Sequence, residues 1–202
     1  MSFSVQTPLR SPRRKRVAWW HAAFIVGVGL LFSLLSVAAP IPKSAPEAQV
    51  KGELLIRLAY VVTWPTNSFQ SPTQPFRVGI LGTDPFGEAL EQTISKRKVA
   101  GRPFEILRSS SPKDLTSCQI VFVPKTETRN IASILAAIRQ PGVLLVGESE
   151  KFCQQGGMVS LLQSGDLPMI EFHIGNTRAA ALDISGHLAN TQGVRFSDRG
   201  NK

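Results

Sequence analysis

The sequence is poor in the residues that usually carry catalysis or bind metals. Its 202 residues include only two cysteines and three histidines, which lie far apart along the chain. No Gly-Lys-Ser/Thr phosphate loop, His-Glu-x-x-His pair or Gly-x-Ser-x-Gly elbow occurs. The glycine turn before Asp84 lacks the Gly-x-Gly-x-x-Gly spacing of a dinucleotide site. We therefore expect no catalytic residue, no metal and no cofactor.

The scarcity of cysteine excludes a disulfide-rich scaffold. Cys118 and Cys153 are 35 positions apart, and three interpretations of them stay open. They are unreactive buried thiols, a mutual disulfide or a redox pair.

The first 38 residues have the order of a secretory signal peptide. A cluster of basic residues is followed by an apolar run over 17–37, and small residues at 36 and 38 suit a signal peptidase. The run is also long enough for an uncleaved membrane anchor. Either form places the rest of the chain outside the cytoplasm, in the periplasm.

Positive charge is scarce once this leader is set aside. The whole chain has a formal net charge of +9, but five of its 23 basic residues and none of its 14 acidic residues belong to the leader. The remaining 18 basic and 14 acidic residues give a net charge of +4. Because no basic stripe with interleaved aromatic residues remains, we expect no nucleic-acid partner.

The pattern after the leader predicts one α/β domain over 47–190. Residues 39–46 are a Pro-rich linker that we expect to be extended. Apolar residues at helical spacing then predict an amphipathic helix over 47–63. Short apolar runs follow at 76–82, 102–108, 118–124 and 142–149, with helical segments at 83–95 and 129–140. This alternation predicts a mostly parallel sheet with flanking helices, in which Asp84 caps the second helix.

The last third of the chain predicts a β-hairpin and a closing helix. Two apolar strands over 158–174 meet at a Ser-Gly-Asp turn, and a helix over 176–188 follows. We expect the polar tail over 191–202 to be flexible.

The second strand of this hairpin suggests a surface for a partner. Ile170, Phe172 and Ile174 alternate with Met169, Glu171 and His173, so the two sets face opposite sides of the sheet. The second set is either a plain surface strand or a docking strip for a partner protein.

The first helix runs into Trp64 and Pro65. Pro65 disfavours the helical conformation at Trp64, which ends the helix. Of three roles for Trp64, as a core anchor, a ligand platform or a family signature, we expect a core anchor with Pro65 fixing the exit of the chain.

These segments together resemble the YfiR-like family. The similarity covers the helix that ends in Trp-Pro, the strand and turn over 76–90, and the strand over 118–123. It continues through the Gly-Gly-Met segment over 142–162 and the closing strand and helix over 170–185. Through this resemblance, Trp64 and Pro65 correspond to a signature pair. Gly156, Gly157 and Met158 correspond to a signature loop.

The resemblance implies a function without chemistry. It implies a periplasmic domain, often a homodimer, that represses an inner-membrane diguanylate cyclase by holding its periplasmic sensor region. Cyclic di-GMP and biofilm formation would fall as a result, and Glu171 becomes a candidate on the partner face. A small-molecule-binding sensor module for another signalling system is the alternative.

Two departures from the family pattern qualify the resemblance. Some relatives bridge a cysteine matching Cys118 to the first strand, and one matching Cys153 to a position just past the glycines. This sequence has Val78, Gly79 and Ser160 in those neighbourhoods, so a redox-gated version of the mechanism would require a bond between Cys118 and Cys153. Gly175 also differs from the residue with which relatives begin the closing helix.

Overall fold

The computed structural model describes residues 44–164, 167–186, 188 and 191–197. The chain divides into two compact units, Met1–Ile41 and Pro42–Lys202, and every described residue belongs to the second. The predicted signal peptide, most of the linker and the turn of the hairpin therefore lie outside the described residues. Within the described ranges, no helix combines the length and apolar character that crossing a bilayer requires.

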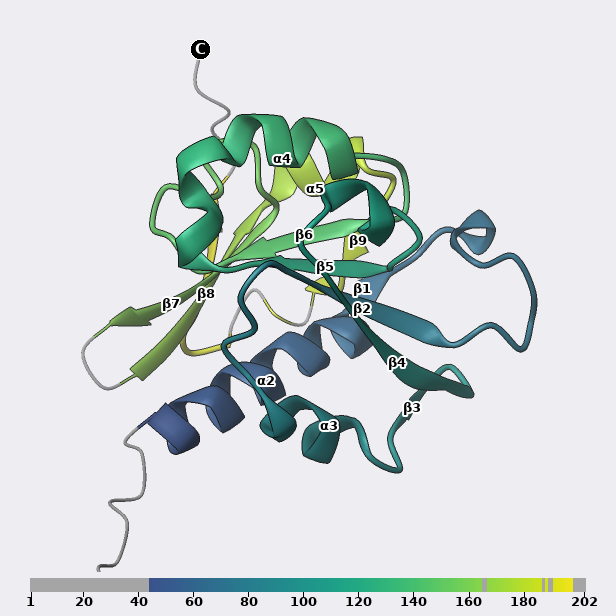
Figure 1. The fold of residues 1–202 in the computed structure, drawn as a ribbon. Helices are drawn as coiled ribbons and strands as arrows, with labels where there is room; N and C mark the ends of the chain where they lie inside the picture. Colours follow the sequence, from purple (N-terminus) through teal and green to yellow (C-terminus); the bar gives the residue numbers. More distant parts are fainter. Residues whose placement is uncertain (1–43, 165–166, 187, 189–190, 198–202) are drawn as a thin grey trace, which may run out of the picture. The chain divides into compact units, whose positions relative to one another are not determined.

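An eight-stranded sheet organises the domain in the order β10-β8-β7-β6-β5-β2-β4-β3 (Figure 1). The strands are β2 Phe76–Leu81, β3 Lys98–Val99, β4 Arg102–Ser109, β5 Ile120–Val123, β6 Leu144–Gly147, β7 Val159–Ser164, β8 Leu167–His173 and β10 Val194–Ser197. Only the pairs β7–β8 and β3–β4 are antiparallel. This confirms the predicted α/β class, the mostly parallel sheet and the C-terminal hairpin.

Helices cover both faces of the sheet (Figure 1). Helices α2 Ser44–Val61 and α3 Glu88–Ile94 lie on one face, and α4 Ile131–Ile138 and α5 Ile174–Ala179 on the other. Because both faces are covered, all four residues of β5 and all four of β6 are buried. Helix α4 contributes a buried stripe at helical spacing, made of Ile131, Ile134, Leu135 and Ile138.

Helix α2 begins at Ser44, earlier than the sequence predicts, so the last residues of the predicted linker are helical. Pro46 lies in the first turn, where its missing N–H breaks no bond within the helix. The helix ends at Val61 and continues into β1 Val62–Thr63, which pairs with β9 Asp183–Ile184 in a separate two-stranded sheet.

Trp64 and Pro65 lie between β1 and a short 3-10 turn over Thr66–Ser68. Pro65 is extended, with φ −63° and ψ 149°. The Trp64 ring packs edge-on against Phe76, with 4.9 Å between the ring centroids. Its Nε1–H donates a hydrogen bond of 3.3 Å to the backbone carbonyl oxygen of Gln119. The packing is that of a core anchor with one satisfied polar group.

The side chain of Gln119 is the buried connector of this region. It is 2 % exposed. Its Oε1 accepts a bond of 2.8 Å from the backbone N–H of Arg77, and its Nε2 donates one of 2.9 Å to the carbonyl oxygen of Ser68. The same amide therefore joins the loop after Trp64 to β2 and to the start of β5.

The helix after β2 starts at Glu88, three residues later than predicted. Gly87 has φ +52°, a left-handed conformation that interrupts any helix begun at Pro85. Asp84 is therefore not an N-cap, and that prediction is wrong. Its Oδ1 accepts a hydrogen bond of 2.7 Å from the N–H of Phe86, and its Oδ2 accepts one of 2.7 Å from Arg108. Asp84 stabilises a turn instead.

The C-terminal part also differs from its prediction. Helix α5 ends at Ala179 instead of residue 188, and Ala181 has φ +57°, which turns the chain into β9. Where a flexible tail is predicted from 191, β10 forms the edge of the sheet and pairs in parallel with β8. The Phe196 ring stacks on Phe172 with 5.5 Å between centroids. Residues 198–202 lie outside the described part.

The substitution Gln119→Leu is expected to destabilise the domain by about 2–4 kcal/mol, because it leaves the N–H of Arg77 and the carbonyl of Ser68 without their partner. Urea unfolding measures the change. The exposed Gln92→Leu is the control and should alter stability by less than about 0.5 kcal/mol. Equal effects of the two substitutions would contradict the role assigned to Gln119.

Candidate functional site

The predicted strip on β8 is not an exposed surface. Glu171 is 7 % exposed and His173 is 3 % exposed, whereas Met169 is half-buried. The predicted alternation does place Phe172 in the core. The expectation that Glu171 and His173 face solvent is wrong, because neighbouring elements engage both side chains.

Glu171 is paired with the edge strand β10. Its Oε2 accepts a hydrogen bond of 2.6 Å from Arg195, whose own side chain is 54 % exposed. The four-residue pairing of β10 with β8 places Arg195 directly opposite Glu171. The ion pair therefore helps to fasten the last strand to the sheet.

His173 caps helix α5. Its Nδ1 accepts a bond of 3.1 Å from the N–H of Asn176, and its carbonyl oxygen accepts one of 2.9 Å from the Thr177 hydroxyl. These bonds satisfy groups at the start of the helix, so His173 has a structural role.

The Gly-Gly-Met segment is a tight bend packed on an aromatic ring. Gly156 has φ +105°, and a Cβ at Gly157 would overlap the ring of Phe152. Met158 is 1 % exposed. The side chain of Asn176 donates to the carbonyl oxygens of Gly157 at 2.7 Å and of Cys153 at 3.2 Å. Asn176 thus joins α5 to this bend, a role that no sequence pattern indicates.

The two cysteines are free, buried thiols that are not bonded to each other. A Cβ at Gly79 would lie 3.0 Å from the Cys118 sulfur, and the Cys153 sulfur lies 3.3 Å from the Ser160 hydroxyl. These are the two neighbourhoods in which the family resemblance puts the bridging cysteines. Burial raises the pKa of both thiols to about 11, so both stay protonated at neutral pH.

The predicted residues form two separate groups. Cys153, Met158, Glu171 and His173 meet around the start of α5, and the N–H of His173 donates to the carbonyl oxygen of Met158 at 2.8 Å. Trp64 and Pro65 belong to the group around Gln119. Neither group holds a nucleophile activated by a base, and no three metal-ligating side chains gather in the described ranges.

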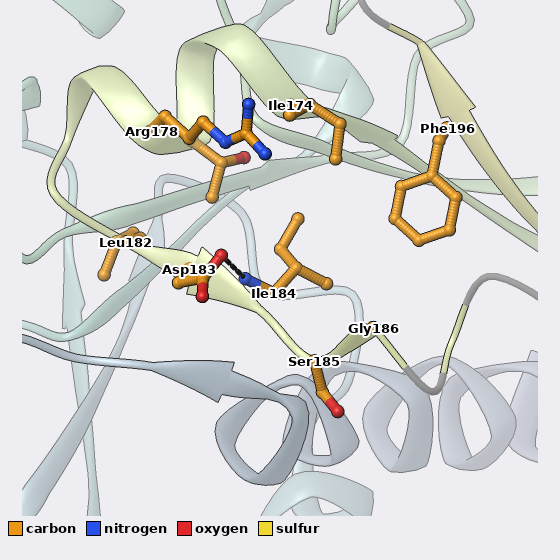
Figure 2. Close-up of a pocket in the computed structure, with 9 residues that line it drawn as sticks. Ile174, Arg178, Leu182, Asp183, Ile184, Ser185, Gly186 and Phe196 are labelled. Atoms are coloured by element: carbon orange, nitrogen blue, oxygen red, sulfur yellow. Dashed lines mark hydrogen bonds between the residues drawn. The ribbon is translucent and has the colours of Figure 1, made fainter.

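A pocket of about 230 Å³ lies between α5, β9 and β10 (Figure 2). Its apolar lining consists of Ile174, Leu182, Ile184 and Phe196. Thr177, Arg178, Asp183 and Ser185 add polar groups. The pocket was not predicted from the sequence, because most of its lining falls within the segment predicted as one continuous helix over 176–188.

The charged groups at the pocket are Arg178 and Asp183. Figure 2 shows the guanidinium of Arg178 extending from α5 over the pocket. Within the described residues, no carboxylate pairs with Arg178. Asp183 accepts a bond of 3.0 Å from the N–H of Ile184. The arrangement suits a small ligand with an apolar body and one anionic group.

Comparison with known proteins identifies the family. The family model described as YfiR/HmsC-like matches residues 48–191. The chain belongs to the YfiR/HmsC-like family. The match covers more than half of the chain, from helix α2 to the segment before β10. None of the curated proteins compared with the chain matches it.

Two solved structures share a distant likeness with this member of the YfiR/HmsC-like family. One is an ABC domain from Streptococcus pneumoniae in complex with L-Trp, with a TM-score of 0.47, 12 % identity and 72 % of this chain covered. The other is a conserved domain protein from Vibrio cholerae, with a TM-score of 0.44, 11 % identity and 76 % covered. This chain spans 60 % of the length of each. Nothing about function follows from likeness at this level.

The substitution Glu171→Lys is expected to destabilise the domain by about 2 kcal/mol or more, because a buried carboxylate is replaced by a cation that faces Arg195. The control is Glu105→Lys, which breaks the more exposed pair with Arg77 and should cost about 1 kcal/mol or less. Thermal unfolding of both variants measures the two changes in stability. A Glu171→Lys variant as stable as the native chain would show that the pair does not hold β10.

Proposed function

We propose that this chain is an exported, periplasmic regulator that represses an inner-membrane diguanylate cyclase by binding its periplasmic sensor region. The support is membership of the YfiR/HmsC-like family over 48–191. Repression lowers cyclic di-GMP and, through it, biofilm formation. The N-terminal pattern of basic, apolar and small residues supports export.

The proposed mechanism is a shift of population. The chain binds the sensor region in the state that keeps the cyclase inactive, and so it needs differential affinity but no chemistry of its own. The buried thiols and the capped His173 suit a rigid binding domain. The signal acts by changing this affinity.

The partner surface includes the end of the hairpin. Leu167 is 64 % exposed, the highest value among the exposed large apolar side chains of the described part. Pro168 beside it is exposed and Met169 is half-buried. Of the three residues predicted as a docking strip, Met169 thus remains in a position to touch a partner, while Glu171 and His173 hold the strand beneath it.

The test uses membranes that contain one diguanylate cyclase with a periplasmic sensor region from the native host. Each such cyclase is assayed for cyclic di-GMP synthesis with and without the purified chain. We expect one cyclase to be inhibited several-fold, and Leu167→Asp to weaken the inhibition by about tenfold or more, as for an anchor residue. The control is Val50→Ser, which removes another exposed apolar side chain (49 % exposed) on α2.

Inhibition of no cyclase in the set would contradict the proposed function. Inhibition that survives Leu167→Asp unchanged would remove only the hairpin end from the interface. Light scattering of the same samples shows whether the domain is the homodimer that the family resemblance implies.

The pocket favours a second candidate, a sensor module that binds a small molecule. Benzoate is a suitable probe, because its ring matches the apolar lining and its carboxylate matches Arg178. We expect benzoate to raise the Tm of the chain by mass action, and benzyl alcohol or the variant Arg178→Gln to abolish the shift. A shift that is equal with benzyl alcohol, or is unchanged in Arg178→Gln, would contradict a carboxylate site.

A further inference from the structure

The positive charge of the domain is concentrated at one edge of the sheet. Edge strand β3, the turn before it and the adjoining parts of α2 and β4 carry five basic residues: Arg57, Lys96, Arg97, Lys98 and Arg102. One carboxylate, that of Glu53, lies among them. This group, called the basic edge below, has a net charge of +4, equal to that of the whole chain after its leader.

Contacts between α2 and β3 bring the basic edge together. Glu53 accepts hydrogen bonds of 3.1 Å from Arg57 and 3.1 Å from Arg97. The Tyr60 hydroxyl donates a bond of 3.2 Å to the carbonyl oxygen of Lys98. The Arg97 bond is the main cause that lowers the pKa of Glu53, so this carboxylate is charged at neutral pH and is shared between two cations.

The remaining cations have no carboxylate to neutralise them. Within the described residues, Lys96 and Lys98 are exposed and have no ion-pair partner. Arg102 lies 4.0 Å above the Phe69 ring and donates to backbone carbonyls of Ser71 and Gln74. The edge thus presents uncompensated positive charge beside an exposed aromatic side chain, that of Tyr60.

We infer that the basic edge docks the domain on a membrane surface that carries anionic phospholipid headgroups. Exposed cations bind such a surface without shape complementarity, each contributing about fivefold to the partition constant near the surface. Tyr60 adds an amphipathic ring of the kind enriched at membrane interfaces. A protein partner that adds a strand here is disfavoured, because β3 has only two residues.

Docking at this edge would orient the domain beside a membrane partner. It goes beyond the proposed function, since the binding of lipid requires no cyclase. The two proposals therefore fail independently.

The experiment is sedimentation of the purified chain with vesicles of phosphatidylcholine alone, or of phosphatidylcholine with roughly 30 % phosphatidylglycerol, at about 0.15 M salt. We expect the chain to bind the vesicles that contain phosphatidylglycerol and not those of phosphatidylcholine alone. We also expect this binding to fall at about 0.5 M salt. The variant Lys96→Glu/Lys98→Glu should lose about tenfold or more of it. The control Lys113→Glu/Lys151→Glu reverses two exposed lysines away from the basic edge and should retain most of it.

The comparison uses the chain from which the leader has been removed, because the basic residues and apolar run of the leader would bind lipid by themselves. Equal binding of this chain to both vesicle types would overturn the inference. Equal losses in the two double variants would overturn it as well, since net charge rather than the basic edge would then govern binding. Circular dichroism of both variants shows that they are folded. Because all four lysines are exposed, unchanged spectra are expected.

Discussion

The buried amide of Gln119 holds together the parts of the chain on which the rest of the domain depends. Its side chain bonds to β2 and to the loop after Pro65, and its backbone carbonyl accepts from both Trp64 and Leu144. Because Gln119 is 2 % exposed, a polar group left unpaired on it would be costly. The exit of helix α2 is thereby fixed to the middle of the sheet, and β1 is brought to the position where it pairs with β9.

This constraint explains why the chain ends a helix on its bulkiest side chain. Trp64 fills the space beside Phe76 and satisfies its only polar group on Gln119, while Pro65 ensures that the chain leaves in an extended conformation. The glycines at 156 and 157 have a comparable role at the other end of the sheet, where the backbone packs on Phe152. The residues that correspond to family signatures are therefore parts of the scaffold.

The sequence was most informative where a pattern is long and all the residues that form it are buried to the same extent. The runs that became β2, β5 and β6 are apolar because helices cover both faces, and the alternation in β8 correctly predicts that Phe172 is buried. Local patterns failed where distant contacts decide the outcome. The alanine-rich segment after Asn176 favours a helix, but pairing of β9 with β1 ends it at Ala179. The polarity of Glu171 and His173 suggested exposure. Instead, Arg195 on a strand that was not predicted pairs with Glu171, and the backbone N–H of Asn176 bonds to His173 inside the domain.

The candidate site was less predictable than the fold for the same reason. The pocket is lined by α5, β9 and β10, and two of these elements were assigned to other structures in the sequence analysis. Asp84 shows the limit of local rules, since it has the right residue type for an N-cap but the left-handed Gly87 follows it. The basic edge was also not predicted, because Arg57 and Arg97 meet at Glu53 only when α2 packs beside the turn before β3.

The central claim is that this domain acts by holding a cyclase in its inactive state. The most direct measurement is cellular cyclic di-GMP in four strains of the native host. The gene is present, deleted, restored in its exported form, or restored in a form that folds but is not exported. Repression from the periplasm predicts that cyclic di-GMP rises on deletion and returns to its original level only with the exported chain. An unchanged level on deletion, in cells shown to express the protein, would contradict the claim.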